Sequence, residues 1–214
     1  MSDIERLLKV TEERYPGPRS SYTQAHLLLA FLTIGETPNI GRQVLARSVG
    51  LGEGAIRTLL RKLKSEGLVK VSRRGSSLTD SGIRTYQRVK NSLPNLVFLG
   101  STGLTVGRKQ IAILVRGAAK NVKHGIEQRD AAVRGGAAGA TTYVIKGTKF
   151  QIPGGSKDCE NDFPTNAWRL LRDELGPRDG DAIIICGSDD ELSSKIGALS
   201  AALTLLVQRP VVRD

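Results

Sequence analysis

The sequence predicts an α+β protein of two domains. Residues 1–94 are expected to form a small helical domain with a β-hairpin, and residues 95–214 an α/β sandwich with a mixed sheet. Helical apolar periodicity and basic residues dominate the first part of the 214-residue chain, whereas short apolar strands alternate with helices in the second. The apolar content of 39% is enough to bury a core in each domain.

Three helices are expected before residue 67. SYTQAHLLLAFLTI (21–34) begins with cap-forming Ser and Thr and continues as a dense apolar run, and IGRQVLARSVG (40–50) predicts a short second helix. The third helix, in GEGAIRTLLRKLKSEG (52–67), has apolar residues at helical spacing: Ile56, Leu59, Leu60 and Leu63. This stripe must face a core, so the cationic side chains of the helix face outward.

A basic hairpin follows the third helix. LVKVS (68–72) alternates as a strand, RRGSS predicts a turn with Gly75 at its tip, and SLTDSG leads into a helix over 79–91. Pro94 ends the domain. Three helices followed by a basic two-stranded hairpin are typical of a winged helix-turn-helix. Residues 1–15 contain an optional further amphipathic helix, whose apolar side would be Ile4, Leu7, Leu8 and Thr11.

The net charge of +11 is concentrated in this domain. Residues 40–90 hold 12 Lys or Arg and three Asp or Glu, which indicates a polyanionic partner, double-stranded DNA. The expected base readers lie on the outward face of the third helix: Arg57, Thr58 and Arg61. The expected phosphate contacts are Arg42, Lys62, Arg73 and Arg74.

The second domain reads as alternating strands and helices in the order β, β, α, β, β, α, β, α. The expected strands are LVFL, QIAILV, TTYVI, KFQIP and AIIIC, and the expected helices span about 118–135, 164–175 and 190–207. QIAILV and AIIIC are continuous apolar runs, which predicts strands buried on both faces of the sheet.

Five side chains are candidates for binding a small-molecule effector: Arg116, Glu127, Arg129, Asp130 and Asp189. Arg116 and Asp189 follow buried strands, beyond whose carboxyl ends ligands bind in open α/β sheets. Arg129 and Asp130 border an expected inward stripe and form either a structural ion pair or a ligand site. That stripe is Val122, Ile126, Val133 and Ala137. Asp189 and Asp190 suit a hydroxyl or amine of a ligand or, as SDDE commonly does, capping of the last helix.

No residue pattern indicates catalysis, a cofactor or a metal site. Cys159 and Cys186 fit a pair of reduced thiols, and neither His26 nor His124 has metal ligands at suitable spacing. GGAAGATT (135–142) follows a helix and so resembles a C-cap more than a phosphate loop. Without an apolar stretch of membrane-spanning length or a secretion signal, the chain is expected to be soluble and cytoplasmic, with no membrane partner.

Two parts of the chain resemble known families. Residues 21–92 are similar to the winged-helix domain of prokaryotic transcriptional regulators, with RTLLRKLKSEGLV as the recognition helix and LTDSG as the exit from the wing. The part from Asn95 resembles an uncharacterised domain found behind winged helices in predicted archaeal transcription regulators. That resemblance lies in GIEQRDAAVRGGAAGATT and GDAIIICGSDDELSSKIGALSAALTLL. Together the two resemblances imply an archaeal transcriptional regulator, but no particular ligand.

These observations favour a DNA-binding transcriptional regulator that is not an enzyme and whose second domain senses an effector. A homodimer is expected, because one recognition helix reads only a few base pairs. Three alternatives stay open. The chain would otherwise be a bifunctional metabolic enzyme carrying its own DNA-binding domain, an architectural DNA-binding protein without an effector, or a protein whose winged helix contacts another protein.

Overall fold

The structure is a computed structural model that describes Leu7 and residues 22–206. The chain divides into two compact units, residues 1–90 and 91–214, which are considered separately. The optional helix within residues 1–15 lies, apart from Leu7, outside the described residues. None of the described helices combines the length and hydropathy that crossing a membrane requires.

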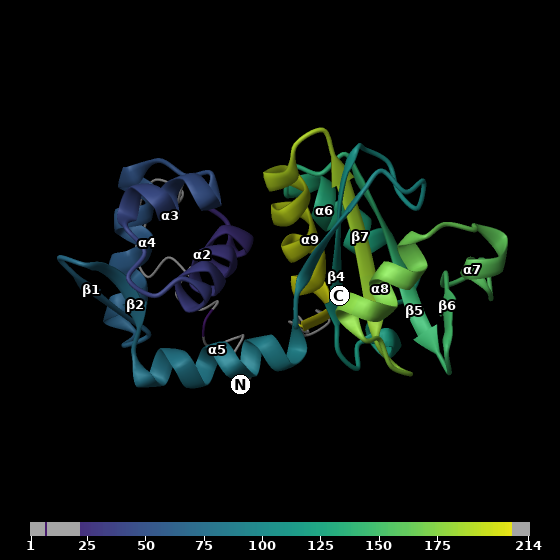
Figure 1. The fold of residues 1–214 in the computed structure, drawn as a ribbon, viewed down its shortest axis with the longest axis horizontal. Helices are drawn as coiled ribbons and strands as arrows, with labels where there is room; N and C mark the ends of the chain where they lie inside the picture. The colour runs from purple at the N-terminus through teal and green to yellow at the C-terminus, as the bar shows by residue number, and fades with distance from the viewer. Residues whose placement is uncertain (1–6, 8–21, 207–214) are drawn as a thin grey trace, which may run out of the picture. The chain divides into compact units, whose positions relative to one another are not determined.

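The first unit contains four described helices and a two-stranded hairpin (Figure 1). In chain order these are α2 (Gln24–Glu36), α3 (Arg42–Val49), α4 (Glu53–Ser65), β1 (Val69–Ser72), β2 (Gly75–Leu78) and α5 (Asp80–Ser92). A capping box starts α2, in which the Thr23 hydroxyl accepts from the His26 N–H and the His26 ring accepts from the Thr23 N–H. Burial lowers the pKa of His26, which favours the neutral ring that this cap requires.

The apolar stripe of α4 lies in the core of this unit, as the sequence predicts. Ile56, Leu59 and Leu63 have no exposed surface, and Leu60 retains 5%. The α4 side chains Arg57, Thr58, Arg61 and Lys64 are exposed. One stripe of four apolar residues therefore fixes which side of α4 faces solvent.

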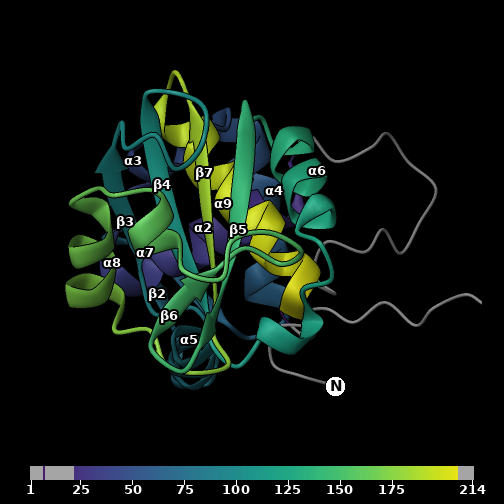
Figure 2. The same cartoon turned by 90° about the vertical axis from the view of Figure 1, so that its right-hand side faces the viewer.

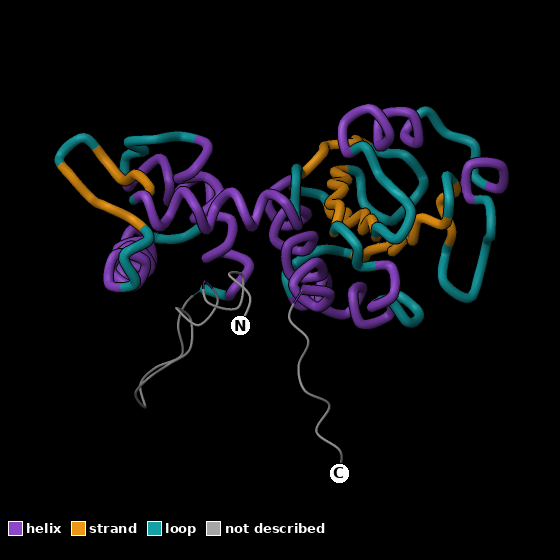
Figure 3. The backbone as a smooth tube through the Cα atoms, turned by 90° about the horizontal axis from the view of Figure 1, so that it is seen from below, coloured by secondary structure: helices purple, strands orange, loops and turns teal. Residues whose placement is uncertain are grey.

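The hairpin is held against the segment that precedes α3. Strands β1 and β2 pair antiparallel from Val69↔Leu78 to Ser72↔Gly75, and Figure 3 shows the hairpin extending away from its helices. Arg73 and Arg74 form the turn, so the prediction that Gly75 lies at the tip is wrong, and Gly75 instead begins β2. Ile40 bridges Ser76 through two backbone hydrogen bonds of 2.9 and 3.1 Å.

The second unit is built on a five-stranded sheet in the order β3-β4-β7-β5-β6. Its strands are β3 (Leu96–Gly100), β4 (Lys109–Val115), β5 (Gly139–Lys146), β6 (Lys149–Gln151) and β7 (Ala182–Ser188). All four pairings are antiparallel, so the expected mixed sheet is wrong. Continuous apolar strands arise here because helices cover both faces of the sheet, which hides the alternation that usually identifies antiparallel strands.

Helices pack on both faces of this sheet (Figures 1 and 2). They are α6 (Ile126–Arg134), α7 (Cys159–Asp162), α8 (Ala167–Leu175) and α9 (Glu191–Leu206). Helices α6 and α9 contact one face, and α8 packs on the other, where Trp168 and Leu171 join Ile183 and Ile185 in one apolar cluster. Successive side chains of β7 therefore enter different cores.

Helix α6 differs from the sequence prediction in length and in orientation. The helix expected over about 118–135 is a 3₁₀ turn at Ala119–Asn121 followed by nine residues of α-helix. Ile126 and Val133, predicted to face inward, are 54% and 48% exposed, whereas Gln128, Ala131 and Ala132 are buried. Gln128 donates to the Thr204 hydroxyl at 2.7 Å, so a polar contact with α9 accompanies the burial of a residue that the predicted inward stripe did not include.

Replacing Gly75 tests how the hairpin is attached. Its φ of +128° is one that L side chains rarely adopt, and an added Cβ would lie within 3 Å of the Asn39 and Ile40 backbone. We expect Gly75→Ala to lower the free energy of unfolding by about 2 kcal/mol, measured by urea titration. Gly67→Ala is the control: it also has positive φ but open space, and should cost only about 1 kcal/mol. Equal losses would contradict the proposed contact.

Candidate nucleic-acid interface

A groove between α4 and the hairpin is lined by cationic side chains. Its volume is about 490 Å³, and it has six cationic side chains and no carboxylate in its lining. The six are Arg42, Arg57, Arg61, Lys64, Arg73 and Arg74. Gly41, Leu60, Val71, Ser72, Gly75 and Ser76 complete the lining. Like charges brought this close repel one another, so the groove favours an anionic occupant.

Three of the six cations come from one face of α4. Arg57, Arg61 and Lys64 stand at i, i+4 and i+7, which places them in one row along the helix. The buried stripe beneath them holds this row toward the groove. Lys64 was not among the residues predicted to bind DNA, although its helical spacing from Arg57 and Arg61 is a signal that could have identified it.

Arg42 reaches the groove from the first residue of α3. Its guanidinium Nη2 lies 3.3 Å from the Glu53 Oε2, and the two side chains are 46% and 44% exposed. An exposed pair of this kind contributes less than about 1 kcal/mol, so a ligand can displace either partner at little cost.

The hairpin supplies the opposite side of the groove. Arg73 and Arg74 occupy the turn, where the Ser72 hydroxyl accepts from the Arg74 N–H at 3.1 Å. Both side chains are exposed. The Ser72 hydroxyl thus stabilises the short turn that carries the two arginines. This turn lies beside the row of cations on α4.

Thr58 and Lys62, also predicted to contact DNA, lie outside the lining of the groove. The Thr58 hydroxyl donates to the Gly54 carbonyl at 3.2 Å, and the Lys62 ammonium stands 5.7 Å from the centroid of the Tyr22 ring. Lys62 is partly buried. Both residues are on α4, and their contact with DNA stays a prediction.

In the second unit, Arg116 makes hydrogen bonds within the protein. Its Nη1 donates to Asp181 Oδ2 at 2.6 Å and to the Gly176 carbonyl at 2.9 Å, and its Nη2 donates to the Leu175 carbonyl at 3.1 Å. The Asp181 side chain is 4% exposed. Arg116 therefore joins the end of β4 to the end of α8 and the start of β7.

The three predicted ligand residues of α6 lie at the surface. Arg129 pairs with Asp130 at 2.9 Å, and the two side chains are 56% and 45% exposed. Glu127 lies 3.8 Å from the Lys123 ammonium in a similarly exposed pair. The expected cost of burying Arg129 and Asp130 does not arise, because their flank of α6 faces solvent.

The two acidic residues before α9 have separate contacts. The Asp190 carboxylate accepts from the Ser193 N–H at 2.8 Å and so caps α9. Hydrogen bonds from the Ser193 hydroxyl and N–H hold the pKa of Asp190 below its ordinary value. Asp189 lies 3.4 Å from Arg108, and both side chains are 82% exposed.

The structure does not bring the five candidate effector residues together. Strands β4 and β7 pair from Lys109↔Ser188 to Val115↔Ala182, so Arg116 and Asp189 follow opposite ends of the sheet, about 20 Å apart. Glu127, Arg129 and Asp130 form an exposed group on α6. Effector binding at any of the five stays a prediction, but they do not form one pocket.

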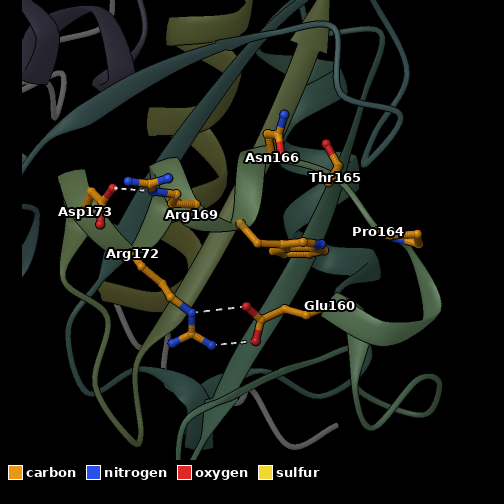
Figure 4. Close-up of a pocket in the computed structure, with 8 residues that line it drawn as sticks. Glu160, Pro164, Thr165, Asn166, Arg169, Arg172 and Asp173 are labelled. Carbon is orange, nitrogen blue, oxygen red and sulfur yellow. Dashed lines mark hydrogen bonds and ion pairs between the residues drawn. The ribbon is translucent and has the colours of Figure 1, made fainter.

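A second hollow, in the second unit, has charged residues that already pair with one another (Figure 4). Its volume is about 810 Å³, and it lies over α8 near Trp168. Arg172 binds both oxygens of Glu160, and Arg169 lies 3.6 Å from Asp173. Unlike the groove, this hollow carries no excess of one charge.

The described residues contain no group of three His, Cys, Asp or Glu that could hold a metal ion. Cys159 and Cys186 are free and buried, and burial raises the pKa of each thiol. Both thiols are therefore poorly reactive, because little of the nucleophilic thiolate forms at neutral pH.

The chain is similar to proteins without an assigned activity. Residues 27–84 match the family described as PH0730-like, N-terminal domain, and residues 106–205 match a domain of unknown function, DUF4443. Among solved structures, the hypothetical protein PH0730 from Pyrococcus horikoshii OT3 superposes with a TM-score of 0.70 at 24% identity. The alignment covers 86% of this chain and 93% of that one. No curated protein matches the chain. This likeness establishes the fold.

Replacing Arg116 tests whether its main role is structural. We expect Arg116→Met to lower the free energy of unfolding by about 3 kcal/mol, because it leaves the buried Asp181 carboxylate without its cation. Thermal unfolding with and without the substitution measures this loss. Arg108→Met removes the exposed pair with Asp189 and should leave stability unchanged. Unchanged stability in Arg116→Met would contradict the structural role.

Proposed function

We propose that this protein is a DNA-binding transcriptional regulator whose first unit is a winged helix-turn-helix. The observation that carries the proposal is the groove between α4 and the hairpin, with six cations and no carboxylate in its lining. DNA presents one negative charge per phosphate, and proteins bind it largely by neutralising those charges. A cationic groove formed by a helix and a hairpin suits that partner.

In this proposal α4 is the recognition helix and the β1–β2 hairpin is the wing. The major groove of DNA admits one α-helix, and the buried stripe of α4 leaves its opposite face available for base edges. Arg57 and Arg61 read bases from that face. The other four cations of the protein groove bind DNA phosphates: Arg42, Lys64, Arg73 and Arg74.

The second unit senses a small-molecule effector in this proposal, and the protein acts as a homodimer. Effector sensing rests on the sequence resemblance described above. Dimerisation rests on the short reach of one recognition helix, since two copies supply both affinity and half-site spacing. No observation favours the enzyme alternative over this function.

Removing the charges of the hairpin turn tests the wing. We expect Arg73→Ala with Arg74→Ala to weaken binding to all duplex sequences alike, because phosphate contacts carry no sequence information. In a plot of log affinity against log salt, the slope should become less steep by about 1.8 per half-site, or about 0.9 per lost contact. Fluorescence anisotropy with a labelled duplex measures both effects.

The matched control for the wing removes two charges elsewhere. Arg84 is exposed on α5 and Arg169 is 89% exposed on α8, and neither lines the groove. Arg84→Ala with Arg169→Ala changes the net charge equally and should leave the salt slope nearly unchanged. Equal slopes for the two double variants would contradict a wing that contacts DNA.

Gly54, in the first turn of α4, should show opposite effects on stability and on binding. An added Cβ would meet no atom within 4 Å, so we expect Gly54→Ala to stabilise the fold by roughly 0.5 kcal/mol. The same methyl would project from the outward face of α4 and hinder its approach to base edges. Urea titration and duplex anisotropy measure the two effects. Unchanged affinity would argue against a close approach of α4 to DNA.

A further inference from the structure

Glu53 is the one acidic residue in α4 and the first residue of that helix. It stands four residues before Arg57, so the two side chains project from neighbouring positions on the helix surface. Its carboxylate is 44% exposed and lies 3.3 Å from Arg42, which lines the groove. A negative charge therefore stands at the rim of a surface that is otherwise cationic.

The fold alone accounts for part of this placement. An acid in the first turn stabilises a helix through the helix dipole, and the pair with Arg42 adds little because both side chains are exposed. The same carboxylate repels every phosphate that approaches the groove. Gly52, the residue before Glu53, has no side chain to cap α4.

Among the bases, cytosine suits a carboxylate on a DNA-binding helix best, because the adenine N6 donor stands beside the N7 acceptor of the same base. Glu and Asp accept a hydrogen bond from the exocyclic N4 amino group of cytosine in the major groove, whereas the other cytosine edge atoms and the phosphates offer nothing to it. In helix-turn-helix proteins the N-terminal residues of the recognition helix contact base edges, and Glu53 opens α4. Gly54 beside it adds no side chain that would hold the helix away from the bases.

We propose that Glu53 is a specificity-determining residue that reads a cytosine in the major groove. This inference rests on the proposed function, with α4 as the recognition helix. Before DNA binds, Arg42 pairs with the Glu53 carboxylate. On binding, Arg42 turns to a phosphate and the carboxylate accepts from the cytosine N4. Duplexes with guanine or thymine at that position are rejected because the carboxylate then faces base acceptors without a donor, and adenine is disfavoured because its N7 acceptor lies beside its N6 donor.

Selection from a random pool of duplexes tests this directly. The unsubstituted protein and Glu53→Gln are each used to select bound sequences, and the position at which the two selections differ identifies the contacted cytosine. Fluorescence anisotropy then measures affinity for three duplexes: the selected site, the same site with this cytosine replaced, and a random sequence. We expect the unsubstituted protein to lose at least roughly fivefold in affinity when the cytosine is replaced. Glu53→Gln should prefer adenine at the same position, because a Gln amide pairs with adenine N6 and N7.

Affinity for random DNA separates base reading from simple charge. Glu53→Gln should bind the random duplex roughly twofold more tightly or better, because one repulsive charge is gone. The matched control is Glu36→Gln, which removes an exposed carboxylate paired with Lys90 at 3.7 Å, away from the groove lining. It should keep the base preference of the unsubstituted protein. Circular dichroism checks that each variant is folded.

The outcomes distinguish this inference from the function on which it rests. If the unsubstituted protein binds no duplex at low salt, the proposed function is wrong and the inference falls with it. If it binds DNA but Glu53→Gln selects the same sequences with the same affinity ratios, the function stands and Glu53 is not a base reader. A loss of cytosine preference in Glu36→Gln as well would also overturn the inference.

Discussion

The burial of one side of α4 is the constraint on which the candidate interface depends. Ile56, Leu59 and Leu63 are fully buried, so α4 cannot rotate about its axis without exposing apolar surface. Each of these side chains contributes about 2 kcal/mol when buried. The positions of Arg57, Arg61 and Lys64 follow from this anchoring, because they stand on the same rigid helix. The core of the first unit thus sets the electrostatics of its surface.

The groove also needs its second side, and a backbone contact supplies it. The bridge between Ile40 and Ser76 attaches the hairpin to the segment just before α3. The Ser77 hydroxyl adds a 3.0 Å contact to the Asn39 side chain and accepts from the Asn39 N–H. Arg42 begins α3 two residues beyond Ile40, so one short segment positions both the hairpin arginines and Arg42. Arg42, Arg73 and Arg74 come from distant parts of the sequence but share this support, whereas the buried stripe holds the cations of α4.

Features that follow from local periodicity were predicted correctly from the sequence. Features that depend on contacts between residues far apart in the chain were not. The stripe of α4 and all five strands of the sheet lie where apolar spacing placed them. The mixed sheet was wrong because strands covered on both faces lose the alternation that marks antiparallel pairing. The inward face of α6 was wrong because Gln128 bonds Thr204 on α9, a contact between residues far apart in the chain. Arg116 and Asp189 looked alike as residues after strands, but antiparallel pairing places them at opposite ends of the sheet.

Nuclear magnetic resonance of the full-length chain titrated with a random-sequence duplex tests the central claim most directly. The account predicts that backbone amide shifts change in α4, in the Arg73–Arg74 turn and at Arg42, and that they saturate at low salt and reverse as salt is raised. Amides of the five-stranded sheet should change little. Changes confined to the second unit, or none at low salt, would contradict the assignment of the groove to DNA.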